Sequence, residues 1–365
     1  MPEQWWPVEF EGKPDFEMAM KRVYAWYNGE MLDRPPVRFY RHNAGDESVP
    51  DNSRWRHLKN RWFDVGYQIE SFLASIKGKT FHGETFPVFW PNLGPNVYAA
   101  FYGGTLEFGD VTSWINHPVK TPEDVERLHF DPEQNFYFQK IEELTRAALT
   151  ECDGKFLVGY TDLHPGLDCV ADWRNPETLC TDFYDHPEMV EQLVALSMRD
   201  FERIYNRFDA MLKEKRQLSV SWLNIPSFGK MHIPSCDFST MISPKLYQRY
   251  GMPILRHEVR LTTHNIFHLD GKGVARHLDE ILKVPEIQAI QWVQSAGTDQ
   301  PIIPWLPLIK KIQRAGKGVV VDMKLEELEP FINEMNPKGL FLCLPARAEE
   351  EELAILKRLE RWLST

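Results

Sequence analysis

The sequence predicts an α/β fold: a single (β/α)8 TIM barrel with an N-terminal helical extension and a long loop after strand 2. First, eight short apolar runs alternate with helical patterns along the 365 residues, and a barrel of this class has eight parallel strands. Second, several runs are apolar on both faces, which is typical of parallel sheets covered by helices. Third, the runs end in polar residues, and in a barrel these ends meet at one rim.

The elements follow in a regular order along one domain, residues 1–365. The N-terminal extension covers 1–34 and includes an expected helix from Asp15 to Tyr27. The Gly-rich segment from Asn92 to Asp131 is expected to form an elaborated loop over the rim. The expected strands are Val37–Tyr40, Pro87–Trp90, Phe156–Tyr160, Leu218–Leu223, Asn265–Leu269, Ala289–Val293, Gly318–Val321 and Gly339–Leu344.

Composition narrows the class of protein. Hydrophobic residues make up 43% of the chain, enough for a large core, and the net charge of −11 argues against nucleic-acid binding. Five cysteines without framework spacing indicate reduced thiols, and no signal peptide or run of roughly 20 apolar residues is present. We therefore expect a cytoplasmic protein with a small-molecule substrate and no membrane partner, and the sequence leaves monomer or homodimer open.

The strongest functional pattern is the run that ends in His268 and Asp270, followed by Gly271. On a strand, residues two apart point to the same face, so these two side chains can share one metal ion or one substrate. A hydrogen bond between them that only stiffens the rim is the alternative reading.

A second polar stretch follows the third run, from Thr161 to Asp168. Asp162 and His164 are expected at the rim, where a histidine beside carboxylates suits proton transfer near neutral pH. Asp168 is expected either to contact substrate or to cap the helix that follows.

Three stretches together resemble the uroporphyrinogen decarboxylase superfamily over nearly the whole chain. Gly29-Glu30 with Asp33 to Val37 is similar to the opening of that family. Cys236-Asp237-Phe238, followed by Ile242 to Tyr247, is similar to its central element. Phe267 to Gly271 stands where many members carry His-x-Cys-Gly.

The resemblance implies one of two chemistries, decarboxylation of uroporphyrinogen or methyl transfer in corrinoid-dependent systems. In the latter a His-x-Cys … Cys set binds zinc. Here Asp270 replaces the first Cys and Cys343 is similar in place to the last, which implies a metal set of His268, Asp270 and Cys343. Such a set fits a divalent ion of the zinc type, harder than one held by thiolates. Cys343 can also be a small buried hydrophobe.

The decarboxylase branch fits less well. Its members open with Arg-Gln-Ala-Gly-Arg-Tyr, whereas this chain has Arg41 to Asp46, in which the second Arg is an Asp. The chain is therefore closer to the corrinoid-dependent methyltransferase-like and uncharacterised members. These uncharacterised members share its Leu163 to Asp168 and Gln291 to Val293 stretches.

We therefore expect a methyltransferase or demethylase that takes a methyl group from a small methoxylated or methylated substrate, with a corrinoid on a separate protein as acceptor. A carboxy-lyase acting on a small acid and a non-catalytic binding barrel are the alternatives. The tryptophans can line the site or belong to the core. The expected catalytic residues are His164, Asp162 and Asp237, and the expected substrate-binding residues are Trp222, Trp292, Gln291, Asn92 and Asp168.

Overall fold

The structure is a computed structural model that describes residues 5–41, 52–294 and 301–362. Two stretches noted in the sequence, His42 to Asp46 and Ser295 to Gly297, lie outside the described residues.

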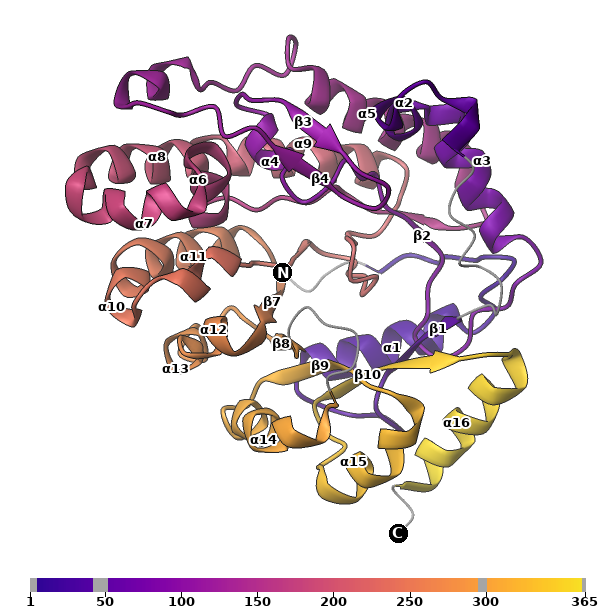
Figure 1. The fold of residues 1–365 in the computed structure, drawn as a ribbon. Coiled ribbons are helices and arrows are strands. Elements are labelled where there is room, and N and C mark those ends of the chain that lie inside the picture. Colours follow the sequence, from indigo (N-terminus) through magenta and orange to yellow (C-terminus); the bar gives the residue numbers. More distant parts are fainter. Residues whose placement is uncertain (1–4, 42–51, 295–300, 363–365) are drawn as a thin grey trace.

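A curled parallel sheet of six strands forms the centre of the molecule (Figure 1). All its neighbouring strands are parallel, and most of the described residues in them are buried. This confirms the expectation of helix-covered parallel strands, apolar on both faces. In spatial order the strands are β1 (Val37–Arg41), β10 (Leu340–Ala346), β9 (Gly318–Asp322), β8 (Ala289–Val293), β7 (His264–Asp270) and β6 (Met231–His232).

Two further parallel strands, β2 (Val88–Phe89) and β5 (Leu157–Val158), pair with each other and not with the six. The architecture is thus a curled half-barrel with a separate strand pair, consistent with part of a TIM-like barrel. Closure into an eight-stranded ladder, as the sequence led us to expect, is not shown. Isolated backbone hydrogen bonds join the segments around the strand pair to the rest of the molecule. The Tyr160 N–H, after β5, donates to Val220 O at 2.9 Å, and the Glu84 N–H, before β2, donates to Val37 O of β1 at 2.7 Å.

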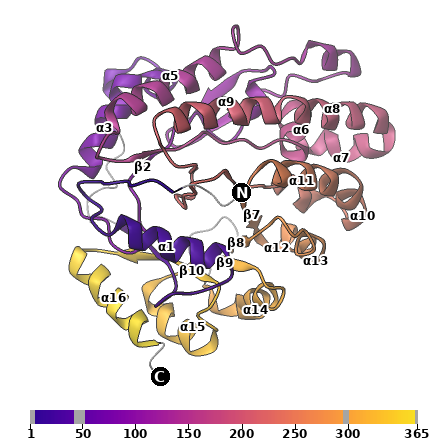
Figure 2. The same ribbon diagram turned by 180° about the vertical axis from the view of Figure 1, so that it is seen from behind.

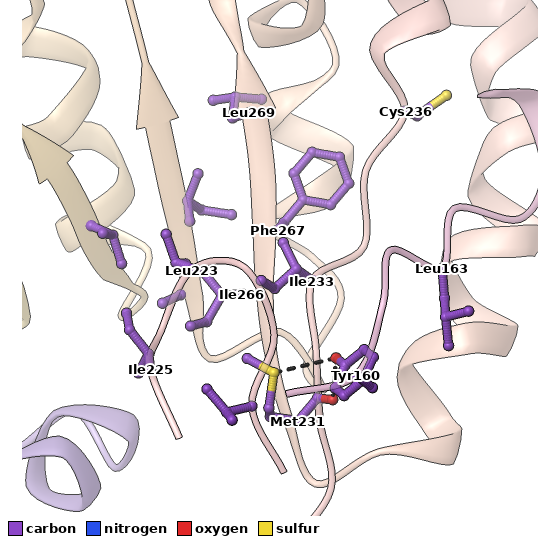
Figure 3. Close-up of a cluster of buried hydrophobic side chains, with 14 of the residues drawn as sticks. Tyr160, Leu163, Leu223, Ile225, Met231, Ile233, Cys236, Ile266, Phe267 and Leu269 are labelled. Carbon is purple, nitrogen blue, oxygen red and sulfur yellow. Dashed lines mark hydrogen bonds between the residues drawn. The ribbon is translucent and has the colours of Figure 1, made fainter. Parts of the chain in front are cut away.

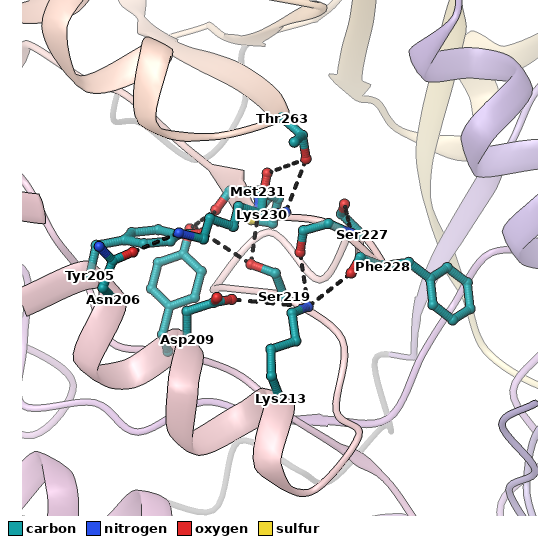
Figure 4. A network of polar contacts seen from close by, with 12 residues as sticks. Tyr205, Asn206, Asp209, Lys213, Ser219, Ser227, Phe228, Lys230, Met231 and Thr263 are labelled. Atoms are coloured by element: carbon teal, nitrogen blue, oxygen red, sulfur yellow. Dashed lines mark hydrogen bonds and ion pairs between the residues drawn. The ribbon is translucent and has the colours of Figure 1, made fainter. Parts of the chain in front are cut away.

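The prediction of a strand from Leu218 to Leu223 is wrong. Ser219 makes only an isolated antiparallel bridge with Ser227, and Asn224 turns the chain back with φ of 57°. The Ser219 hydroxyl accepts the Met231 N–H at 3.0 Å, so a side chain replaces a ladder bond at the start of β6 (Figure 4). Lys213 closes this network by donating to the carbonyls of Phe228 and Gly229 at 3.0 and 2.9 Å.

Helices surround the sheet (Figures 1 and 2). The expected N-terminal helix is present as α1, and its Trp26 indole donates to Gly339 O at 3.0 Å, across the amino ends of β9 and β10. The helices are α1 (Phe16–Tyr27), α2 (Leu58–Phe63), α3 (Val65–Ile76), α4 (Val97–Ala100), α5 (Phe136–Glu151), α6 (Leu167–Arg174), α7 (Pro176–Asp185), α8 (Pro187–Arg199), α9 (Phe201–Glu214), α10 (Pro244–Leu246), α11 (Met252–Glu258), α12 (Gly271–Ala275), α13 (Leu278–Ile281), α14 (Leu306–Arg314), α15 (Leu328–Glu334) and α16 (Glu349–Trp362).

The long segment after β2 is more ordered than the loop expected there. It contains α4 and an antiparallel hairpin of β3 (Leu106–Phe108) and β4 (Ser113–Ile115). The hairpin turn leaves Val111 exposed.

Buried apolar side chains of β7 and of the loops after β5 and around β6 lie in one cluster (Figure 3). Leu223, Ile225, Ile233 and Ile266 belong to it, and each of the four is nearly or fully buried. The Tyr160 hydroxyl in this cluster donates to Met231 O at 2.7 Å, so its polar group is satisfied. Within the described part of the chain, no helix has both the length and the apolar character needed to cross a membrane.

Candidate functional site

Polar side chains from three neighbouring strand ends meet at a cavity of about 560 Å³. Asp162 and His164 follow β5, Asp237 follows β6, and His268 lies near the carboxyl end of β7. Because the carboxyl ends of parallel strands share one edge, residues far apart in sequence come together here. The structure therefore places His268, Asp162, His164 and Asp168 around one space, whereas Asp270 is not among the residues that line it.

Asp237, His268 and Asp270 form a compact group, with one ligand-type atom of each lying within 4.8 Å of the others. The His268 ring is held at Nδ1, which lies 2.7 Å from Gln291 Oε1. Burial raises the pKa of Asp270, and the nearby Asp237 adds to this, whereas His268 opposes it. Two carboxylates and one imidazole offer the oxygen and nitrogen donors that divalent ions use in proteins.

Cys343, expected as a metal ligand, is not in this group; Asp237 takes that place. Cys343 is fully buried in β10, in register with Asp322 of β9 and Arg38 of β1. Burial raises the pKa of its thiol to about 12, opposed first by Arg38. Strands β8 and β9 separate Cys343 from His268 in the sheet, which is why the two side chains do not share a site.

Asp162 and His164 form a pair whose proton lies on the carboxyl group. Asp162 Oδ1 and His164 Nε2 are 3.9 Å apart. Burial raises the pKa of Asp162 to about 8 and lowers the pKa of His164 to about 4. Near pH 7 the pair is therefore a neutral acid beside a neutral imidazole rather than an ion pair. Among the described residues, neither Asp162 Oδ1 nor His164 Nδ1 has a hydrogen-bond partner.

Asp168 holds the segment that carries Asp237. Its two carboxylate oxygens accept the backbone N–H groups of Asp237 at 3.0 Å and Phe238 at 2.8 Å. Burial and the Asp237 charge raise the pKa of Asp168 to about 7, opposed by these two bonds. Asp168 lies in the first turn of α6, and Gly166 before it has φ of 78° and packs so close to Ile254 that a Cβ would clash. Asp168 thus lines the cavity and anchors the Asp237 segment, and its contact with a substrate stays a prediction.

The expected aromatic and amide contacts divide into two groups. Trp222 lines the cavity, and its ring stands edge-on to His268 at 5.2 Å between centroids. Asn92 also lines it, and its side-chain oxygen accepts the Gly94 N–H at 2.7 Å. Trp292 is fully buried against Trp305 and does not line the cavity.

Gln291, the strand neighbour of Trp292, points to the other face and reaches His268 instead of the cavity. Side chains alternate along a strand, so these two residues cannot serve the same space.

The cavity lining also includes residues that the sequence reasoning did not predict, among them Trp90 and Asp172. The Trp90 indole N–H lacks a partner among the described residues. Asp172 accepts from Asn96 Nδ2 at 2.6 Å, and burial raises its pKa to about 8. Its position four residues after Asp168 on one helix was a signal that could have identified it.

The cavity is acidic and aromatic. Four aspartates line it, Asp162, Asp168, Asp172 and Asp237, and no Lys or Arg is among the described residues around it. A ligand with several carboxylates would meet no positive side chain here, and such ligands are usually bound by Arg or Lys.

The chain is similar in fold to a methyltransferase from Methanosarcina mazei, with a TM-score of 0.59 and 10% sequence identity. The similarity covers 95% of this chain and 99% of that one. No protein-family model matches the sequence, and no curated protein matches it. At this identity the likeness establishes the class of fold, a methyltransferase-like α/β architecture.

Proposed function

We propose that this protein is a methyltransferase-type enzyme that takes a methyl group from a small methylated or methoxylated substrate in the cavity. The observation that carries the proposal is the Asp237, His268 and Asp270 group, of which Asp237 and His268 line the same cavity as Asp162, a carboxyl group that is protonated near pH 7. Loss of a methyl group from an ether or amine requires the departing heteroatom to be stabilised, and these residues offer two means of doing so. The similarity in fold to a methyltransferase supports the same reading.

A divalent ion of the zinc type fits the Asp237, His268 and Asp270 group. The carboxylate and imidazole donors suit such an ion, and His268 is held at its other nitrogen by an amide oxygen, as metal-binding histidines commonly are. Bound there, the ion would supply Lewis-acid polarisation of the substrate heteroatom.

The protein's own residues supply the proton for the leaving heteroatom and line the cavity around the substrate. Asp162 is protonated near pH 7 and donates its proton to the heteroatom, which keeps the electron pair of the breaking bond to carbon. The methyl group passes to an external nucleophile, for which we propose a corrinoid carried by a separate protein. His164 stays neutral beside Asp162, and Trp222 shields one side of the space.

The side chains that line the cavity argue against the main alternative function, a carboxy-lyase. A carboxy-lyase must bind a free carboxylate, yet the described residues around the cavity include four aspartates and no Lys or Arg.

The test is methyl transfer to reduced cobalamin, free and protein-bound, across a panel of methoxylated and methylated compounds, with elemental analysis of the purified protein alongside. We expect methylcobalamin to form and about one divalent ion per chain, as a single three-residue group implies. Release of CO2 from a small acid by the protein alone, with no methylcobalamin from any compound, would replace this function with the lyase.

A further inference from the structure

A row of polar side chains crosses the sheet interior from β7 to β1, behind the cavity. The register places His268 beside Gln291, and Asp322 beside Cys343, which lies beside Arg38. Of these five, only His268 lines the cavity. The other four can act on a ligand in this cavity through His268.

The contacts in this row are continuous. His268 Nδ1 lies 2.7 Å from Gln291 Oε1. Burial raises the pKa of the Asp322 carboxyl group, whereas the Arg38 charge and the hydrogen bonds from Cys343 and Gln291 oppose that shift. Arg38 Nη2 lies 3.8 Å from Asp322 Oδ1, and another guanidinium nitrogen donates to Leu223 O.

The donors and acceptors of these groups determine which atom donates each hydrogen bond along the row. The amide oxygen of Gln291 is the atom that lies beside His268 Nδ1, which leaves the Gln291 NH2 group for Asp322. An amide oxygen can only accept a hydrogen bond. His268 must therefore carry its hydrogen on Nδ1. A neutral imidazole has one N–H, so Nε2 keeps the lone pair that a ligand atom needs.

We propose that Gln291 and Asp322 are positioning residues that fix His268 in the Nδ1–H tautomer, with Nε2 as the free donor for the cavity. This deepens the proposed function, because the metal group needs that nitrogen. Cys343 and Arg38 complete the row: the buried thiol donates to Asp322, and the Arg38 charge keeps a positive partner beside the carboxylate. The cysteine thus acts from β10, which β9 and β8 separate from the strand of His268, without touching a ligand.

The test uses three substitutions that separate shape from hydrogen-bonding character. Gln291→Met keeps the length of the side chain and removes its acceptor. Gln291→Glu supplies a group that only accepts, so it should retain the Nδ1–H form. Gln294→Met is the matched control, because Gln294 lies just beyond the same strand and donates to Asp322 O at 3.0 Å, not to His268.

The first readout is the tautomer of His268 in metal-free full-length protein, from the nitrogen-15 shifts of labelled histidine, assigned with His268→Gln. We expect Nδ1–H in the wild type, in Gln291→Glu and in Gln294→Met, and loss of that preference in Gln291→Met. Wild-type His268 in the Nε2–H form would overturn the proposal, as would a Gln291→Met protein that keeps Nδ1–H. Asp322→Asn, which is further from the ring, should also weaken the preference and serves if Gln291→Met does not fold.

The second readout is affinity for Zn²⁺ alone, by competition with a chelator. Loss of an outer partner of a metal-binding histidine typically weakens binding by about 10–100-fold, and we expect this for Gln291→Met and no change for Gln294→Met. Equal affinity in both variants would contradict the positioning role. If the wild type binds no Zn²⁺ while the tautomer pattern holds, the metal-assisted function fails and the positioning role stands.

Discussion

Two regions of the molecule, called flanks below, differ in strand length and in how many of their described polar groups lack a partner. On one flank, β1, β8, β9 and β10 are five to seven residues long, and Gln291, Asp322 and Cys343 bond to one another in a row. On the other, β2, β5 and β6 have two residues each. The loops after β2 and β5 carry Trp90, Asp162 and His164, each with an atom unpartnered among the described residues. Regular strands therefore support the site, and the irregular flank leaves polar groups for a ligand.

The largest expected effect is on the irregular flank. Asp162→Asn should reduce the rate of methyl transfer by about 10²–10⁴ with little change in substrate affinity, since loss of a general acid has that size of effect. In the wild type the rate should fall as pH rises through about 8, where Asp162 loses its proton. Rates from pH 6 to 9 check both expectations, with Asp185→Asn, on the exposed end of α7, as control. An unchanged rate in Asp162→Asn would remove it from the chemistry.

The next effect separates the two candidate ligands. Asp237→Asn should weaken Zn²⁺ binding by about 100-fold or more, because the change removes an anionic donor from a small ligand group. Cys343→Ser should leave the affinity within a few-fold, since a hydroxyl can still donate to Asp322. Titration against a chelator measures both. The reverse result would restore Cys343 as a ligand and exclude Asp237.

A smaller effect concerns stability and pH. The folded pKa of Asp162, about 8, lies above its unfolded value of about 3.9, so the folded state holds a proton that the unfolded state releases. The contribution of protonated Asp162 to the folding free energy is fully present below the unfolded pKa. It is lost as the pH rises toward the folded pKa. Asp162→Asn, which cannot ionise, should therefore gain stability over the wild type between pH 4 and 8, on the order of a few kcal/mol at most. Urea denaturation at several pH values tests this, and a pH-independent difference would contradict it.

The smallest effect tests the loop that replaced a strand. Ser219→Ala removes the acceptor of the Met231 N–H and should cost about 1 kcal/mol of stability, the usual net value of such a bond. Zn²⁺ affinity should not change, because Ser219 lies outside the cavity lining. A loss of metal binding at unchanged stability would show that the loop acts on the site instead.

The sequence predicted the fold where local signals were strong. The apolar runs of β7, β8, β9 and β10 could be recognised without tertiary information, and so could the His268 and Asp270 pair at the end of β7. The run from Leu218 to Leu223 has the same apolar character, but its outcome depends on Ser227 and Met231, which bond to Ser219 from further along the chain.

The site could be predicted only in part, because some of its side-chain orientations and contacts are not determined by the local sequence. Gln291 and Trp292 lie in a run that is apolar on both faces, so no alternation indicated which of them faced inward. Asp237 joins the His268 group on a segment held by Asp168, 69 residues earlier, and no local pattern encodes such a contact.

The brevity of β2, β5 and β6 also has a consequence for the way the molecule opens. A strand of two residues contributes few ladder hydrogen bonds, and amides in such regions exchange with solvent through local openings that need far less than the global unfolding free energy. In deuterated water, amides beside the cavity on this flank should exchange long before those of β8, β9 and β10. Solvent and small molecules would then reach the cavity while the rest of the sheet stays closed.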